Sequence, residues 1–115
     1  MDNIQTLKDV KRLRQFLTPE DRWTRHRYWA LKPGIDPDFN PNTCRVKAST
    51  HCFCLVGAAR HLFGQHTPRF EAVIEATGRT QSQLVDFNDT ARSHQAILDL
   101  LDKAIAKLEA ANAPS

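Results

Sequence analysis

Apolar residues recur at the spacing of an α-helix over most of this chain. Between residues 3 and 17, Leu7, Val10, Leu13 and Leu17 fall on one side of a helix, with charged residues on the opposite side. The pattern is widest near the end of the chain, where a broad apolar stripe predicts a long last helix. This stripe consists of Ile97, Leu98, Leu101, Ala104, Ile105 and Leu108.

Capping patterns place further helix boundaries. TPED at 18–21 is typical of a helix start and predicts a short second helix that runs towards Ala30. Residues 67–78 begin with Thr-Pro and end with Gly, so they predict another complete helix. TQSQ at 80–83 opens one short helical turn, and residues 87–93 follow as a connector.

A long loop interrupts this helical pattern. KPGIDPDFNPNT at 32–43 contains three prolines, which remove backbone donors and favour extended geometry. A small β-hairpin within 22–48 is an open alternative for this part of the chain. The sequence predicts one all-α domain over residues 1–115, with its core in 3–109 and a frayed tail at 110–115. We expect a compact bundle of about four main helices plus short helical turns and this one long Pro-rich loop.

The composition favours a folded intracellular protein. Of the 115 residues, 41% are hydrophobic and 25% are charged, which is typical of a packed globule. No apolar run approaches the ~20 residues that a membrane span requires, and residues 1–17 lack the apolar core of a signal peptide. Three cysteines, an odd number, indicate reduced thiols. We expect a cytoplasmic protein that does not contact a membrane.

HCFCLVGAARH at 51–61 suggests a metal site, because it holds two cysteines and two histidines. On a helix over residues 51–64, Cys52 and Cys54 lie on nearly opposite sides, and Cys54 and His61 are about 10 Å apart along the axis. Neither arrangement suits zinc, whose ligands lie ~2.0–2.3 Å from the metal. The sequence predicts no metal site and no cofactor.

A catalytic thiol is the alternative for Cys54. A thiol in the first turn of a helix lies at the positive end of the helix dipole, which lowers its pKa. His94 is the candidate base, with Asn88 or Asp89 to orient the imidazole ring. The competing interpretation is that Cys54 is buried packing and that His94, Asn88 and Asp89 cap and connect helices.

A second candidate site combines basic and aromatic residues. RWTRHRYW at 22–29 interleaves the two kinds, and residues 1–70 carry twelve Lys and Arg against six Asp and Glu. Such a stretch can anchor a protein partner, bind the phosphates and bases of a nucleic acid, or pack its rings in the core. The charged side of the first helix extends this surface. The candidate partner-binding residues are Arg22, Trp23, Arg25, Arg27, Tyr28 and Trp29, together with Lys8, Lys11 and Arg12.

Four stretches together resemble an uncharacterised family of small bacterial and phage proteins. The family pattern reads Trp-Cys-Leu-x-Gly-Ala, then Trp-Asn-Asp, then His-x-x-Val-Leu-x-x-Leu-Asp-x-Ala-Ile; Phe53 and Phe87 stand here in place of two tryptophans. The stretches are Trp23 with Thr24, CFCLVGAA at 52–59, DFND at 86–89 and SHQAILDLLDKAI at 93–105. The matching residues of the pattern are Cys54, Gly57, Ala58, Asn88, Asp89, His94, Leu101, Asp102 and Ala104.

This resemblance spans residues 23–106 and implies a small helical domain of bacterial or phage origin, without implying an activity. Taken together, the sequence predicts a non-enzymatic helical module that binds a macromolecular partner, in the first place a protein, in an inhibitor or accessory role. Two alternatives are open. One is a small Cys-dependent hydrolase or transferase that uses Cys54, and the other is a nucleic-acid-binding protein that uses residues 22–29.

Overall fold

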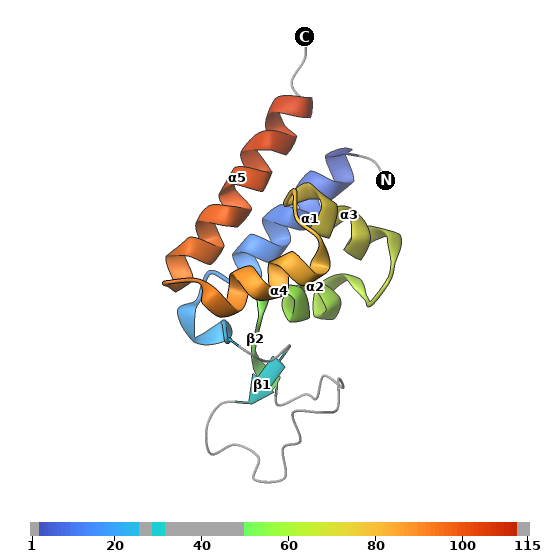
Figure 1. The fold of residues 1–115 in the computed structure, drawn as a ribbon. Helices are drawn as coiled ribbons and strands as arrows, with labels where there is room; N and C mark the ends of the chain where they lie inside the picture. Colours follow the sequence, from blue (N-terminus) through green and yellow to red (C-terminus); the bar gives the residue numbers. More distant parts are fainter. Residues whose placement is uncertain (1–2, 26–28, 32–49, 113–115) are drawn as a thin grey trace.

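The computed structural model describes residues 3–25, 29–31 and 50–112. Within these ranges the chain is mostly helical and adds two short strands (Figure 1). The α-helices are α1 (Asn3–Phe16), α2 (Leu55–Phe63), α3 (Pro68–Ala76), α4 (Gln81–Thr90) and α5 (His94–Asn112). A short 3-10 helix, η1 (Glu20–Arg22), precedes the strands β1 (Trp29–Leu31) and β2 (Thr50–Phe53).

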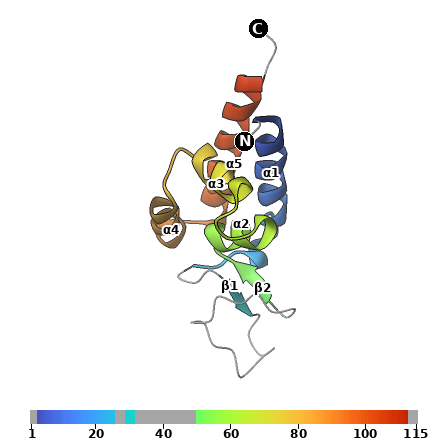
Figure 2. The same cartoon turned by 90° about the vertical axis from the view of Figure 1, so that its right-hand side faces the viewer.

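The two longest helices, α1 and α5, lie side by side (Figure 1, Figure 2). Helix α3 packs against α1, and α2 packs against both α3 and α4. The predicted apolar side of α1 faces the core, since Val10, Leu13 and Leu17 are buried. Most of the predicted stripe of α5 is buried too. The first and last predicted helices are thereby confirmed, and the burial of their apolar sides stabilises the pair.

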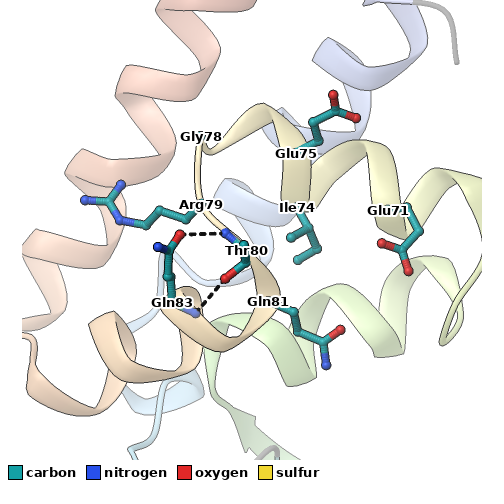
Figure 3. A pocket seen from close by; sticks show the side chains of 8 residues that line it. All are labelled: Glu71, Ile74, Glu75, Gly78, Arg79, Thr80, Gln81 and Gln83. Carbon is teal, nitrogen blue, oxygen red and sulfur yellow. Dashed lines mark hydrogen bonds between the residues drawn. The ribbon is translucent and has the colours of Figure 1, made fainter.

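The described ranges contain five main helices, whereas the sequence predicts about four. The difference is α4, a ten-residue helix where one short turn and a connector are predicted. The predicted capping box is present: Thr80 Oγ1 accepts from the Gln83 N–H at 3.1 Å, and Gln83 Oε1 accepts from the Thr80 N–H at 2.9 Å (Figure 3). The helix then continues because Leu84 and Asn88, one turn apart, both face the core. Because Asn88 is polar, the apolar pattern of the sequence does not indicate this buried side.

Strands β1 and β2 form a two-stranded antiparallel sheet at one end of the helices (Figure 1). Ala30 pairs with Cys52, and the Thr24 N–H donates to the Phe53 carbonyl at 2.9 Å. The helix predicted over residues 51–64 is therefore wrong in its first turn, and α2 begins only at Leu55. Backbone pairing with a segment distant in sequence overrides the local helical pattern there.

The short helix predicted from 18–21 towards Ala30 is also wrong beyond η1, because Ala30 belongs to β1. The hairpin that the sequence leaves open within 22–48 has its first strand in that range, but the partner strand is β2, beyond residue 48. The long Pro-rich loop predicted at 32–43 lies outside the described residues.

The two boundaries of α3 behave as the capping rules require. The Thr67 side chain caps α3 by accepting from the Phe70 N–H at 3.1 Å, and Gly78 follows that helix with a φ of 75°. Helix α5 continues to Asn112, past residue 109, at which the predicted core ends.

No helix among the described residues is long and apolar enough to cross a lipid bilayer.

An ion pair between buried Asp9 and half-exposed Arg69 joins α1 to α3. The Asp9 side chain is 3% exposed, and Arg69 donates to its two carboxylate oxygens at 2.7 and 3.0 Å. Gln5 donates to the same carboxylate at 2.9 Å. Burial by itself raises the pKa of Asp9, but these hydrogen bonds and the charges of Arg69 and Arg12 outweigh burial, so the pKa is lowered. The pair therefore holds α3 against α1 in the ionised state.

Candidate functional site

Asn88 on α4 is a fully buried side chain that joins three segments of the chain. Its Oδ1 accepts from the Trp23 indole N–H at 2.7 Å and from the Leu55 backbone N–H at 3.0 Å. Its Nδ2 donates to the Thr24 carbonyl at 2.9 Å and approaches Asp89 Oδ1 at 3.4 Å. Both lone pairs of the oxygen and both N–H groups of the amide are thus engaged. Asn88 ties α4 to the start of α2 and to the segment after η1.

Cys54 lies beside this amide as the N-cap residue of α2. Its Sγ accepts from the Gly57 N–H at 3.2 Å, and the side chain is buried. Burial raises the pKa of the Cys54 thiol to about 11, and the charge of Asp89 adds to this against the lowering effect of the Gly57 and Val56 N–H groups. Activated cysteines have the opposite shift. The environment of Cys54 therefore favours a neutral thiol that caps a helix.

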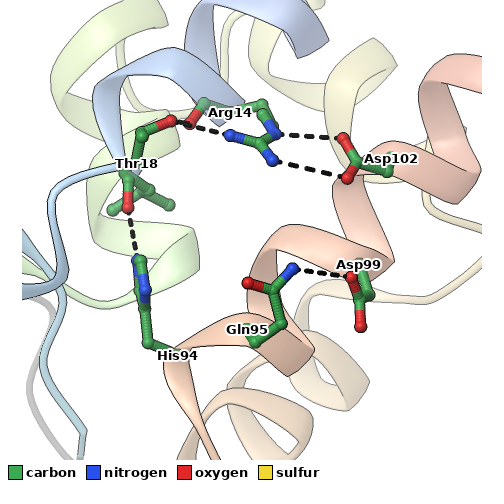
Figure 4. A network of polar contacts seen from close by, with 7 residues as sticks. Arg14, Thr18, His94, Gln95, Asp99 and Asp102 are labelled. Atoms are coloured by element: carbon green, nitrogen blue, oxygen red, sulfur yellow. Dashed lines mark hydrogen bonds and ion pairs between the residues drawn. The ribbon is translucent and has the colours of Figure 1, made fainter.

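His94, the first residue of α5, is buried and points towards the end of α1 (Figure 4). Its Nε2 lies 2.6 Å from the Leu17 carbonyl oxygen. Because a carbonyl only accepts, Nε2 carries the proton and donates it. The ring lies 5.9 Å from that of Trp23, centroid to centroid. The imidazole therefore connects α5 to α1 and to Trp23.

The structure thus brings the four candidate catalytic residues into one region. Cys54, Asn88 and Asp89 meet at the start of α2, and Trp23 bridges from Asn88 to His94. Asn88, Cys54 and His94 bind backbone groups, and Asn88 also contacts Asp89, which is the pattern of a polar cluster that joins helices.

Two cavities among the described residues lie elsewhere. One, of about 540 Å³, is an open hollow lined by α3, the start of α4 and the turn between them; Figure 3 shows the side chains that line it. The other, of about 460 Å³, is bounded by α1, α3 and α5. Neither is lined by a candidate catalytic residue. Among the described residues, no three His, Cys, Asp or Glu side chains are grouped to hold a metal ion.

Trp23 and Arg25, two of the candidate partner-binding residues, face inwards. The Arg25 guanidinium lies over the Trp23 ring, 4.6 Å from its centroid, and donates to the Ala91 carbonyl at 2.6 Å. Together they cover the end of α4. Arg27 and Tyr28 lie outside the described residues, and of Trp29 only the backbone in β1 is described.

The cations of α1 divide into two sides. On the side towards α5, the Lys11 Nζ lies 3.5 Å from Glu109, and Arg14 binds Asp102 with Nε at 3.0 Å (Figure 4). Exposed Arg12 lies on the other side, 5.9 Å from the centroid of the Phe63 ring on α2. The charges facing α5 are neutralised by that helix, and the positive potential is left on the side of α2.

Arg22 and His61 lie against Phe16 at the end of α1. The Arg22 guanidinium of η1 lies over its ring at 4.7 Å, and the His61 ring of α2 lies at 5.6 Å. His61 also stacks on Phe53, with 4.9 Å between centroids. Partial burial, and then the charges of Arg12 and Arg22, lower the pKa of His61. We call Lys8, Arg12, Arg22 and His61 the basic surface.

His61 is the member of this surface that the sequence does not predict. The sequence pattern shows only that His61 and Cys54 are too far apart to bind one metal ion. Arg12 and Phe16 are one turn apart on α1, which is the available local signal. The approach of His61 to Phe16 depends on how α2 packs against α1, and no local pattern encodes it.

A model of the family of unknown function DUF6197 matches residues 1–107. The chain belongs to this family. The expectation of an uncharacterised family is thereby confirmed, and the DUF6197 match includes α1 as well as the region of the predicted resemblance. The Asn88 cluster and the basic surface both fall within the DUF6197 region. No curated protein and no solved structure matches the chain.

Proposed function

We propose that this protein is a non-enzymatic module that binds a protein partner through the basic surface. One observation carries the proposal: three separate elements bring Arg12, Arg22 and His61 together, with Arg22 and His61 against Phe16 and the charge of Arg12 acting on His61. Within the described ranges, neither the Arg12 nor the Arg22 guanidinium forms an ion pair with a carboxylate. As part of the same proposal, the partner is a cytoplasmic protein of a bacterium or phage, which the module inhibits or assists.

The state of the candidate catalytic residues supports a binding role. A nucleophilic thiol needs a lowered pKa, and burial raises that of Cys54 to about 11. The Nε2 of His94 donates to the Leu17 carbonyl, so the ring joins α5 to the end of α1 and only its Nδ1 can accept a proton. The side-chain amide of Asn88 forms hydrogen bonds with the backbone and with Trp23. These contacts stabilise the fold on which the basic surface is displayed.

The aromatic rings favour a protein over a single-stranded nucleic acid. Proteins that bind single strands stack the bases on exposed rings. Here a guanidinium lies over each half-exposed ring whose side chain the structure describes, and it competes with a base for that ring. These pairs are Arg22 over Phe16, Arg25 over Trp23 and Arg79 over Phe87, at 4.7, 4.6 and 4.9 Å from the centroids.

The surface of the described residues offers little apolar area for a partner. Ile4 is the large hydrophobic residue that is exposed there, at 57%. Obligate partners are held by extensive apolar contact, whereas charged surfaces give fast and salt-sensitive association. We therefore expect a reversible complex that assembles by charge attraction.

A capture experiment with two matched variants tests this proposal. The first variant reverses three charges of the basic surface: Lys8→Glu, Arg12→Glu and Arg22→Glu. The control reverses three exposed charges at the other end of the chain: Arg92→Glu, Lys103→Glu and Lys107→Glu. Both have the same net charge. A protein that native and control retain, and that the first variant loses, supports the proposal; retention by all three, or loss by both variants alike, contradicts it.

A further inference from the structure

We propose that Arg12, Arg22 and His61 form a receptor for carboxylate groups beside Phe16 and Phe63, which takes an Asp- and Glu-rich segment of the partner. This inference rests on the proposed function and names the chemistry that the basic surface recognises. Three elements supply the site: α1 carries Arg12 and Phe16, η1 carries Arg22, and α2 carries His61.

Aromatic rings orient the donors of this site. The Arg22 guanidinium lies over Phe16 at 4.7 Å, and that of Arg12 lies 5.9 Å from the Phe63 centroid. A guanidinium stacked on a ring keeps its N–H groups at the edge of its plane, where they match the two oxygens of a carboxylate. Holding the fork on a ring also reduces the side-chain entropy that is lost on binding.

Charge within the site favours an anion. The charges of Arg12 and Arg22 both act on His61 and lower its pKa, so the positive potentials of the two guanidiniums overlap at the imidazole. Asp9, the carboxylate on which the charge of Arg12 acts, is already bound at both oxygens by Arg69. A carboxylate from outside is attracted by this combined potential, whereas a cationic or neutral segment is not.

Acidic peptide fits the site better than nucleic acid does. A nucleic-acid surface spreads its cations along several phosphates and leaves aromatic rings open for bases. Here the charges of Arg12 and Arg22 both act at His61, and Arg22 already lies over the half-exposed Phe16 ring. Carboxylates accept from planar guanidinium forks without needing a ring of their own.

Fluorescence anisotropy with a labelled Glu-rich peptide, at ~50 mM salt, tests the receptor. We expect the native protein to bind this peptide more tightly than single-stranded DNA of equal charge. In the double variant Arg12→Gln/Arg22→Gln, peptide affinity should fall by about tenfold or more, because charge-assisted hydrogen bonds are lost. The control Arg92→Gln/Lys103→Gln removes the same charge from exposed positions on the α5 side and should bind within about twofold of the native protein.

A charge-preserving variant separates the oriented fork from net charge. Arg22→Lys keeps the cation but removes the planar donor pair, so it should weaken peptide binding severalfold. Far-ultraviolet circular dichroism and a thermal melt confirm that each variant is folded. Equal loss in the control, an unchanged Gln variant, or tighter binding of DNA than of peptide would overturn the receptor.

The failures of the receptor and of the proposed function can be told apart. If partner capture depends on the basic surface while the Glu-rich peptide ignores Arg12 and Arg22, the receptor is wrong and the binding surface stands. If the peptide binds through Arg12 and Arg22 while capture is unaffected by charge reversal, the receptor stands and the proposed function is wrong.

Discussion

The indole N–H of Trp23 donates a 2.7 Å hydrogen bond to the side-chain oxygen of Asn88, 65 residues further along the chain. The same oxygen accepts from the first residue of α2, and the amide nitrogen donates to Thr24. One buried side chain therefore sets the relative positions of α2, α4 and the segment that follows η1. Since η1 carries Arg22, this cluster also supports the basic surface.

Replacement of Asn88 by alanine should destabilise the protein by about 3 kcal/mol, because several buried donors and acceptors lose their partner at once. Asp86→Ala, at an exposed position of the same helix, should change stability by no more than about 0.5 kcal/mol. Urea unfolding followed by circular dichroism measures both. A loss for Asn88→Ala as small as that of the control would show that the cluster does not hold these segments together.

Cys54 should react slowly with alkylating agents near neutral pH. With a pKa of about 11, on the order of one thiol in ten thousand is ionised at pH 7. The rate of iodoacetamide labelling can be measured in a Cys44→Ser/Cys52→Ser background, which leaves Cys54 as the single thiol. A labelling rate near neutral pH that matches or exceeds that of free cysteine would contradict this expectation and would support the alternative of a catalytic Cys54.

The same thiol should make stability depend on pH in the alkaline range. Its pKa is raised from 9.0 to about 11, so the folded state holds the proton more tightly than the unfolded state. This contribution is complete below pH 9 and is lost as the pH rises towards 11. The stability difference between native protein and Cys54→Ala should therefore shrink by about 2 kcal/mol over that interval. A constant difference would contradict the burial of the thiol.

Asp9 should act in the opposite pH range. Its pKa is lowered below 3.8, so its contribution is present above that pH and is lost as the pH falls through the folded-state value. Asp9→Asn should cost about 2 kcal/mol near neutral pH, because the bond pair to Arg69 is weakened. The cost should disappear in acid. Denaturant unfolding across this range measures it, and Asp99→Asn, on the exposed side of α5, serves as the control.

The helices are predictable where an apolar stripe repeats, as in α1 and α5, and where a cap is explicit, as at Thr67 and Thr80. Two elements cannot be predicted from these patterns, for physical reasons. The buried side of α4 includes Asn88, so its apolar pattern stops early. Residues 51–53 form a strand because β1 pairs with them, and that partner lies far away in sequence.

The candidate sites are likewise predictable from the sequence only in part. Residue chemistry groups Cys54, Asn88, Asp89 and His94, and the structure brings them into one region. Their roles follow from contacts that no local pattern reveals, such as the bond from His94 to the Leu17 carbonyl at 2.6 Å. Likewise, the charge of Arg22 is evident from the sequence, but its position over Phe16 and near His61 depends on the packing of α1 with η1 and α2.

The most direct test of a protein-binding basic surface is the dissociation constant of the purified partner, measured by calorimetry at several salt concentrations. We predict that the Lys8→Glu/Arg12→Glu/Arg22→Glu variant binds at least about a hundredfold more weakly than the native protein, since like charges then face each other. The native affinity should fall as salt rises. The Arg92→Glu/Lys103→Glu/Lys107→Glu control should retain the native dissociation constant. Equal affinities for all three proteins, or a native affinity that does not depend on salt, would contradict the account.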